Sequence, residues 1–152
     1  MGKELMKDPL NIVICGVGGQ GNILATELLG SAMVEKGYLT TVGETYGASQ
    51  RGGAVMSHVR ISVDKELGVL IPRGQADIII GFEPLETVRV AREYGNKDTW
   101  VIFDSRPNYP IGVLSGEANY PVIEDIEAEL KKLCGKVQIV EATDLAVKAG
   151  NS

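Results

Sequence analysis

The sequence contains few of the side chains from which metal centres and disulfide frameworks are built. Its 152 residues include two cysteines, Cys15 and Cys134, and a single histidine, His58. Two thiols are too few for a four-iron cluster, which takes about four cysteine ligands, and the usual zinc sites also need more ligands. The scarcity of cysteine is typical of a reducing compartment and excludes a disulfide-stapled scaffold. We expect no metal site on this chain, so any redox metal chemistry must occur on another one.

Long apolar runs and dense positive charge are missing as well. No run approaches the roughly 18 apolar residues that span a bilayer, and residues 1–10 form a polar leader without the apolar core of a secretory signal. Fifteen basic side chains stand against twenty acidic ones, for a net charge of −5. Without a basic run, nucleic acid and anionic membranes are poor partners. We expect a cytoplasmic protein that binds neither.

The composition itself is that of one ordinary globular domain. Hydrophobic residues make up 44% of the chain and charged residues 23%, close to the averages for soluble proteins. Apolar runs and period-two alternation predict strands at 11–15, 38–42, 54–63, 78–80, 100–103 and 137–140. Apolar residues at helical spacing predict helices at 22–36, 84–93 and 123–133, and a last one that Thr143 caps. Loops are expected at 43–53 and 107–121. The alternation of strands and helices predicts a single-domain α/β sandwich.

Two patterns also predict which faces of these elements are buried. Leu24, Leu28 and Ala32 fall four residues apart, which predicts the inward face of the first helix. The alternation at 54–63 predicts a half-exposed antiparallel edge strand rather than a covered parallel strand.

A glycine-rich turn follows the first expected strand and opens the first expected helix. Gly16, Gly18 and Gly21 match the pattern G-x-G-x-x-G, and Gly19 and Gln20 lie between them. Small residues let a phosphate approach backbone N–H groups at the positive end of a helix. The turn therefore predicts a backbone anion site. The alternative is a tight turn whose glycines only allow the helix to pack closely on the sheet.

A dinucleotide site would need one more residue. In such sites an acidic side chain about twenty positions after the glycines binds the ribose. Glu44 lies near that distance, but it follows Gly43 and leads directly into a glycine-containing loop. An independent NAD-binding oxidoreductase is therefore an alternative that depends on Glu44.

Residues 44–53 form the most unusual segment of the chain. Its three glycines, which include Gly52 and Gly53, permit backbone conformations closed to other residues. Arg51 offers a planar fork suited to carboxylate or phosphate, and Gln50 adds a neutral amide. Loops of this kind are frequent places for ligand or subunit contacts, and a plain surface loop is the alternative.

The remaining reactive side chains have structural explanations. His58 has no carboxylate at a fixed offset, and Cys15 ends an apolar strand, so we interpret both as structural residues. Glu83 and Glu86 suit the start of a helix. Residues 104–106 follow a strand at a common ligand edge of α/β sheets. No nucleophile elbow, phosphate loop or histidine–metal spacing occurs, so we predict no catalytic residue on this chain.

Four segments together resemble one known family. They are ICGVGGQG at 14–21, GASQRGG at 47–53, SHVRI at 57–61 and GFEPLE at 81–86. In this order they resemble the gamma-type subunit of the 2-oxoacid:ferredoxin oxidoreductases, from about residue 11 to 151. The segments QRGG and EPLE are most similar to the small (beta) subunit of the indolepyruvate ferredoxin oxidoreductase branch, where Met-Ala is commoner than the present Ala-Ser. The resemblance predicts a gamma-type domain over 11–152 that lacks the family's C-terminal helix.

The resemblance implies a Rossmann-like three-layer α/β domain with a mostly parallel, mixed sheet. It also implies a subunit that is inactive alone, in an enzyme that oxidatively decarboxylates a 2-oxoacid, such as an arylpyruvate like indolepyruvate, to an acyl-CoA and reduces ferredoxin. Thiamine diphosphate and iron–sulfur clusters would belong to a larger partner subunit, because this chain lacks a Gly-Asp-Gly thiamine signature and the necessary cysteines.

This chain would then contribute to assembly and to handling CoA as cosubstrate, and would bind no cofactor tightly. The expected binding residues are Gly16, Gly18, Gly19, Gln20, Gly21, Gln50, Arg51, Gly52 and Gly53. A purely structural assembly module without a ligand is the further alternative.

Overall fold

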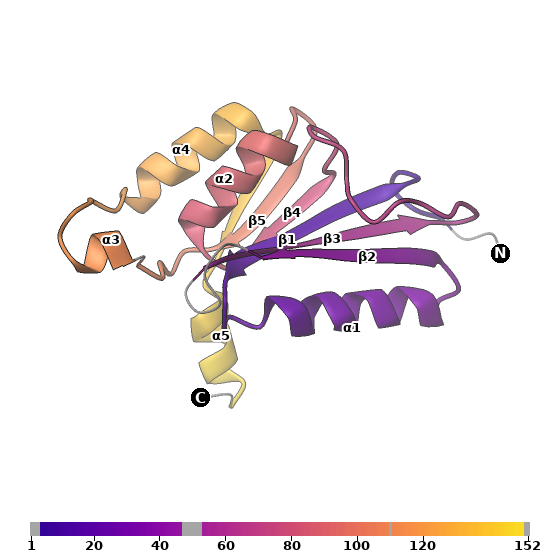
Figure 1. Cartoon of the computed structure of the whole chain (residues 1–152), viewed down its shortest axis with the longest axis horizontal. Helices are drawn as coiled ribbons and strands as arrows, with labels where there is room; N and C mark the ends of the chain where they lie inside the picture. Colours follow the sequence, from indigo (N-terminus) through magenta and orange to yellow (C-terminus); the bar gives the residue numbers. More distant parts are fainter. Residues whose placement is uncertain (1–3, 47–52, 110, 151–152) are drawn as a thin grey trace.

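The fold is built around strand β1 (Leu10–Val17), all eight residues of which are buried. The computed structural model describes residues 4–46, 53–109 and 111–150. In them, one six-stranded sheet has the order β2-β3-β1-β4-β5-β6 (Figure 1). The other strands are β2 (Leu39–Tyr46), β3 (Ala54–Ser62), β4 (Ile78–Gly81), β5 (Trp100–Asp104) and β6 (Lys136–Val140). The pairs β1–β4, β4–β5 and β5–β6 are parallel, whereas β3 is antiparallel to both of its neighbours. The predicted mixed, mostly parallel sheet is confirmed.

Helices cover both faces of this sheet. The helices are α1 (Asn22–Glu35), α2 (Pro84–Tyr94), α3 (Ile111–Leu114), α4 (Ile123–Leu133) and α5 (Ala142–Lys148). Figure 1 shows α1 along one face, while α2 and α4 lie side by side on the other. This arrangement is the three-layer α/β domain that was expected. None of the described helices combines the length and apolarity needed to span a membrane.

Two apolar cores fill the spaces between the layers. The core under α2 and α4 contains fully buried Val13, Ile79, Val101, Phe103 and Leu130. The core on the α1 side is smaller and gathers Leu10, Ile12, Ile14, Val59 and Ile61. Because side chains alternate along a strand, the continuous apolar run of β1 supplies both cores.

The buried face of α1 differs from the predicted one. Leu24 and Leu28 are 61% and 63% exposed, and the buried positions are Asn22, Thr26 and Gly30. The reason is the close approach of the helix to the sheet: a Cβ at Gly30 would lie 3.3 Å from the Val42 side chain. Small residues make the closest part of this contact, and Leu29 and Met33 pack beside them on the core. The expectation that Leu24, Leu28 and Ala32 point inward is therefore wrong.

Strand β3 is also not the edge strand that its alternation predicts. It lies between β2 and β1, and the segment that follows it folds back to contact its side chains. The Arg60 guanidinium donates to the carbonyls of Gly68 (3.2 Å) and Leu70 (3.3 Å). His58 is fully buried there, and its Nδ1 accepts a hydrogen bond from the Ile71 amide (3.0 Å). The returning chain therefore covers polar residues that an edge strand would expose.

Two element ends and one missed helix need correction as well. Strand β2 continues to Tyr46, because β3 offers pairing partners that far, so the first part of the expected loop 43–53 is strand. The short helix α3 lies inside the segment 107–121, which was expected to be a loop throughout. Thr143 is not the cap of the last helix, because α5 begins at Ala142 and its N-cap is Glu141.

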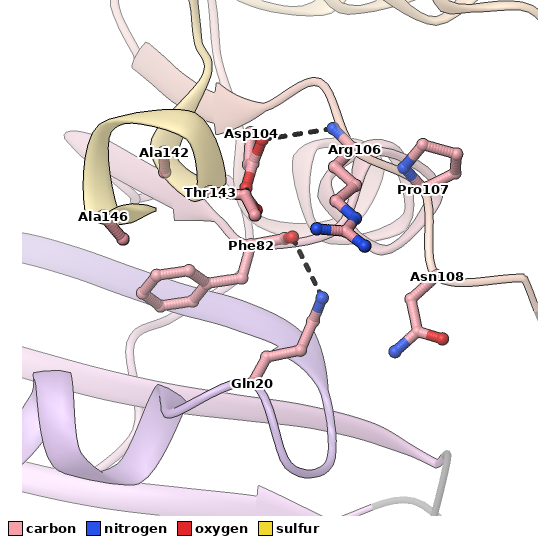
Figure 2. A pocket seen from close by; sticks show the side chains of 9 residues that line it. All are labelled: Gln20, Phe82, Asp104, Arg106, Pro107, Asn108, Ala142, Thr143 and Ala146. Atoms are coloured by element: carbon pink, nitrogen blue, oxygen red, sulfur yellow. Dashed lines mark hydrogen bonds between the residues drawn. The ribbon is translucent and has the colours of Figure 1, made fainter. Parts of the chain in front are cut away.

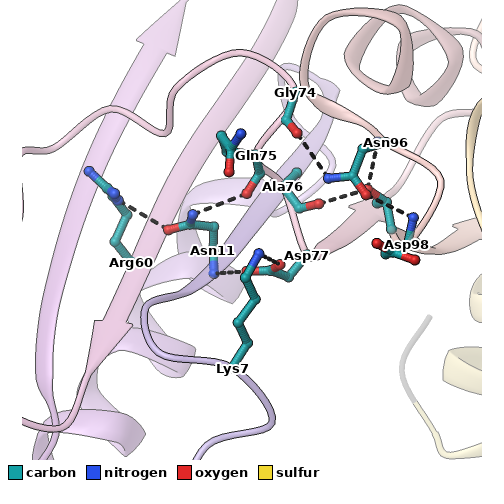
Figure 3. Close-up of polar contacts among 10 residues, drawn as sticks. Lys7, Asn11, Arg60, Gly74, Gln75, Ala76, Asp77, Asn96 and Asp98 are labelled. Carbon is teal, nitrogen blue, oxygen red and sulfur yellow. Dashed lines mark hydrogen bonds and ion pairs between the residues drawn. The ribbon is translucent and has the colours of Figure 1, made fainter.

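Polar contacts close the amino end of the sheet (Figure 3). The Asp77 carboxylate accepts hydrogen bonds from Lys7 Nζ (2.9 Å) and from the Asn11 amide (2.8 Å). The Asn11 side chain donates to the Gln75 carbonyl (3.0 Å) and accepts from Arg60 Nε (3.1 Å). These groups satisfy one another, so the amino edge of the sheet is held by its own polar contacts.

Candidate functional site

The carboxyl ends of β1 and β4 flank a natural crevice. The chain leaves β1 through α1 on one face of the sheet and leaves β4 through α2 on the other (Figure 1). Neighbouring parallel strands whose connections diverge in this way form the crevice in which open α/β sheets bind ligands. The glycine turn at 16–21 and the segment after β5 both lie at this edge.

The glycine turn needs its glycines for two different reasons. Gly19 and Gly21 have φ values of 94° and 86°, in the left-handed region that other residues rarely adopt. At Gly16 the limit is space, because a Cβ would lie 2.7 Å from Gln20 Oε1 and 2.9 Å from the Asn22 amide. The sequence pattern therefore identified a turn that substitutions would strain or crowd.

The turn leaves the N-terminal end of α1 open to an anion. Gly21 is the N-cap and supplies no side chain to the first-turn N–H groups, and the first turn has no acidic residue. The first helical hydrogen bond runs from the Ala25 amide to the Gly21 carbonyl (2.9 Å). Unpaired N–H groups and the helix dipole together favour a negatively charged group at this position.

The two glycine segments of the sequence meet at one point. The Gly18 amide donates to the Gly53 carbonyl over 3.0 Å, which joins the turn to the start of β3. Gln50, Arg51 and Gly52 lie outside the described residues. Beside this contact is a hollow of about 420 Å³, the turn pocket. The turn pocket is lined by Gly18, Gly19, Gly21, Asn22, Ile23, Leu24 and Val55.

Asn22 is a residue of this site that the sequence did not reveal. It is 3% exposed, and neither atom of its side-chain amide has a hydrogen-bond partner among the described residues. The amide packs against Gly16, beneath the turn. Its only sequence signal was its place directly after the glycine pattern, which indicated no more than a helix start.

A second hollow, of about 530 Å³, lies between Gln20 and the segment after β5 and is called the edge pocket (Figure 2). Gln20 lines this hollow, where its Oε1 accepts from the Val17 amide (2.7 Å) and its Nε2 donates to the Phe82 carbonyl (3.2 Å). The edge pocket is lined by Gln20, Phe82, Asp104, Arg106, Pro107, Asn108, Ala142, Thr143 and Ala146. The sequence indicated 104–106 as a ligand edge, but Asn108 and Thr143 join it only through the fold.

The other reactive side chains serve the structure rather than this site. Burial lowers the pKa of His58, and its Nδ1 is already used as an acceptor. Burial raises the pKa of the Cys15 thiol far above its ordinary range, which keeps the thiol protonated and unreactive. The Glu83 carboxylate accepts from the Glu86 amide (2.8 Å) as the N-cap of α2. Their interpretation as structural residues is consistent with these contacts.

Glu44, on which the dinucleotide alternative depends, lies on a strand that is not adjacent to β1. It pairs with Ser57 of β3, and β3 separates it from the strand that carries the glycine turn. One intervening strand adds about 4.8 Å to the separation. This position does not suit a contact between Glu44 and a ribose held at the turn.

Comparisons with known proteins find relatives that match most of this chain. A family model described as pyruvate ferredoxin/flavodoxin oxidoreductase matches residues 11–152. The chain is 43% identical over 142 residues to the indolepyruvate oxidoreductase subunit IorB of Pyrococcus horikoshii. This match covers 93% of this chain and 69% of that protein. The chain is 42% identical, with the same coverage, to the IorB subunit of Archaeoglobus fulgidus.

Solved structures share the fold at lower identity. The pyruvate oxidoreductase subunit PORC of Thermotoga maritima superposes with a TM-score of 0.60 and 19% identity, over 92% of this chain and 66% of that one. The 2-oxoglutarate:ferredoxin oxidoreductase of Magnetococcus marinus, solved with 2-oxoglutarate, coenzyme A and succinyl-CoA bound, gives a TM-score of 0.66 and 20% identity. That match covers 93% of this chain and 21% of the longer chain.

Proposed function

The chain belongs to the pyruvate ferredoxin/flavodoxin oxidoreductase family, and on that premise we propose that it is the small subunit of a cytoplasmic arylpyruvate oxidoreductase. The complex would convert a substrate such as indolepyruvate to an acyl-CoA and pass the electrons to ferredoxin. The observation that carries this proposal is the 42–43% identity over 93% of the chain to indolepyruvate oxidoreductase subunits.

The residues of this chain do not fit thiamine diphosphate or an iron–sulfur cluster, the groups that would perform the redox chemistry. An iron–sulfur cluster takes about four thiolates, whereas the sequence has two cysteines, both of them buried. The sequence also lacks the Gly-Asp-Gly signature of thiamine diphosphate sites. We therefore place thiamine diphosphate and the clusters on a larger partner subunit, with ferredoxin meeting the assembled complex.

The role that we propose for this chain is to help the complex hold CoA. The CoA diphosphate would meet the open N-terminus of α1 at the turn pocket, where Gly16, Gly18, Gly19, Gln20 and Gly21 shape the backbone. The Gly18–Gly53 hydrogen bond supports adding the second segment, Gln50, Arg51, Gly52 and Gly53, to the same site. Arg51 would supply the cation that the described part of the turn pocket lacks.

Reconstitution tests the subunit assignment directly. The purified chain, supplied with indolepyruvate, CoA and a viologen acceptor, should be colourless and inactive by itself. Mixed with the larger thiamine-dependent subunit from the same source, it should restore CoA-dependent acceptor reduction. Reduction by the chain alone, or full activity of the larger subunit without it, would overturn the proposal.

The CoA site is tested separately with two matched glycine substitutions. Gly19 and Gly116 both have left-handed φ values, 94° and 81°, and both have open space around the missing Cβ. Gly19→Ala should raise the KM of the complex for CoA, because it strains the turn. Gly116→Ala carries the same backbone penalty far from the turn pocket and should leave that KM unchanged. Equal effects of the two changes would refute the assignment of CoA to the turn pocket.

A further inference from the structure

The apolar and the polar residues of the edge pocket lie at opposite ends of it. Phe82 extends its ring towards Ala146 at one end, beside Ala142 (Figure 2). At the other end the Arg106 side chain reaches between Gln20 and Asn108. A pocket with this division suits a molecule that has a flat apolar body and one polar end.

The two charged side chains of the edge pocket differ in the hydrogen bonds that they already form. The Asp104 carboxylate is 7% exposed and already accepts two hydrogen bonds, from the Arg106 backbone amide (3.1 Å) and the Thr143 hydroxyl (3.2 Å). The Arg106 guanidinium forms no ion pair or hydrogen bond with any residue that the structure describes. The pocket therefore holds one cation with its donors available and one carboxylate each of whose oxygens already accepts a hydrogen bond.

Neutral donors stand next to this cation. The Gln20 side-chain amide gives one of its two hydrogens to the Phe82 carbonyl (3.2 Å), and the second is available for a ligand. Asn108 adds a further exposed amide on the same side of the pocket (Figure 2). A guanidinium fork beside amide N–H groups matches a carboxylate with a neighbouring carbonyl oxygen.

We propose that the edge pocket binds a small aromatic carboxylate, with the carboxylate on Arg106 and the ring against Phe82, Ala142 and Ala146. An aryl 2-oxoacid belongs to this class, so the proposal extends the proposed function by giving this chain its own contact with the substrate class. It rests on the proposed function only for that last step, because the ligand chemistry follows from the pocket itself.

The charge count favours a carboxylate over a phosphate. A phosphate monoester carries about −1.5 to −2 at neutral pH, whereas a carboxylate carries a single charge. The described lining of the edge pocket offers one guanidinium, and the Asp104 carboxylate repels a second negative charge. A monoanion is neutralised by Arg106 alone, whereas a phosphate dianion would leave an unpaired charge beside Asp104.

Binding to the full chain tests the proposal with three probes. These are indole-3-pyruvate, the uncharged 3-methylindole and AMP, each titrated by ligand-observed NMR or calorimetry. Indole-3-pyruvate should bind with a Kd of about 1 mM or tighter, and 3-methylindole at least tenfold more weakly. Arg106→Gln should weaken indole-3-pyruvate at least tenfold, and Arg106→Lys less, because lysine keeps the charge but not the fork. Arg73→Gln is the matched control, since Arg73 is 83% exposed and remote from the pocket.

The outcomes separate this inference from the proposed function. Tighter binding of AMP, with displacement of indole-3-pyruvate, would identify a nucleotide site and overturn the proposal. No binding of indole-3-pyruvate, or equal losses in Arg106→Gln and Arg73→Gln, would overturn it as well. These results concern the free chain, so CoA-dependent turnover of the reconstituted complex still tests the subunit assignment independently.

Discussion

Gln20 joins the ends of two neighbouring strands by donating its side-chain amide to the carbonyl of Phe82 over 3.2 Å. The same side chain accepts a hydrogen bond from the Val17 amide (2.7 Å), so one residue holds both the glycine turn and the end of β4. It also lines the edge pocket. The shape of the whole carboxyl edge therefore depends on an amide that occupies a variable position of the glycine pattern.

Removing this amide should loosen the turn. Gln20→Ala loses two hydrogen bonds, each worth about 0.5–1.5 kcal/mol, so the free energy of unfolding should fall by about 1–3 kcal/mol. Gln20→Glu keeps the acceptor for Val17 but sets a carboxylate against the Phe82 carbonyl, so it should lose about as much. Urea denaturation of the free chain measures both changes. Unchanged urea midpoints would show that the two hydrogen bonds of the Gln20 amide add no net stability over its hydrogen bonds to water in the unfolded chain.

Gly81 should be the least replaceable glycine of the described sheet. A Cβ there would lie 1.8 Å from the Thr87 hydroxyl oxygen and 2.8 Å from the Thr87 Cβ, so helix α2 would have to move. We expect Gly81→Ala to cost about 1–3 kcal/mol of stability through overpacking. Gly68→Ala is the control, because Gly68 has no left-handed φ and no atom within 4 Å of the added Cβ. Thermal melting that ranks the two variants equally would contradict this account.

Two leucines with the same chemistry should differ sharply in their contribution to stability. Leu28 of α1 is 63% exposed, whereas Leu130 of α4 is fully buried. Leu28→Ala should change the free energy of unfolding by no more than about 0.5 kcal/mol, and Leu130→Ala should cost about 2–5 kcal/mol. Denaturation of the two variants side by side provides the measurement. A large loss of unfolding free energy in Leu28→Ala would show that Leu28 is buried, as the sequence predicted for α1.

These leucines also show where sequence reasoning succeeded and where it failed. Helix α4 has the predicted bounds, Ile123–Leu133, because its apolar face meets the sheet in the usual way. The spacing in α1 is equally regular, but its buried positions include Thr26 and Gly30 rather than the predicted leucines. No single-helix pattern reports how closely a helix approaches its neighbours. Period-two alternation likewise identified β3 without revealing that a returning segment covers it.

The candidate site also has one part that could be predicted from the sequence and one part that could not. The glycine turn is a local feature, so its residues, spacing and backbone demands could be predicted from the sequence. The edge pocket combines Gln20, Phe82, 104–108 and 142–146, which are far apart along the chain. Such a site exists only once the sheet order is known, and the insertion of β3 beside β1 gave no signal in the sequence.

Stability should decline in mild acid because of His58. Burial lowers its pKa in the folded state below the ordinary value of 6.5, and the effect of Arg60 in the same direction is opposed by Glu93. The unfolded chain therefore takes up a proton first as the pH falls, so the stability present above pH 6.5 is lost between 6.5 and the lower folded pKa. Protonation also removes the acceptor for the Ile71 amide. His58→Asn keeps an acceptor near that position, and its free energy of unfolding should show a shallower slope over this range. Parallel slopes would mean that other groups cause the decline.

Arg51 provides the last test, and it concerns a residue outside the described part of the chain. The segment that carries it ends at Gly53, whose carbonyl is bonded to the Gly18 amide of the turn. A guanidinium on this segment is thus tied by a short stretch of chain to the proposed CoA diphosphate site, where a charge-assisted hydrogen bond contributes about 1.5–3 kcal/mol. Arg51→Ala should reduce CoA-dependent turnover or subunit affinity about tenfold or more, and Arg51→Lys should recover part of that loss. The free chain should melt nearly as the wild type does, because surface substitutions usually change stability by about 0.5 kcal/mol or less. If Arg51→Ala instead unfolds the free chain while the fraction that assembles turns over normally, the residue is structural and does not belong to the CoA site.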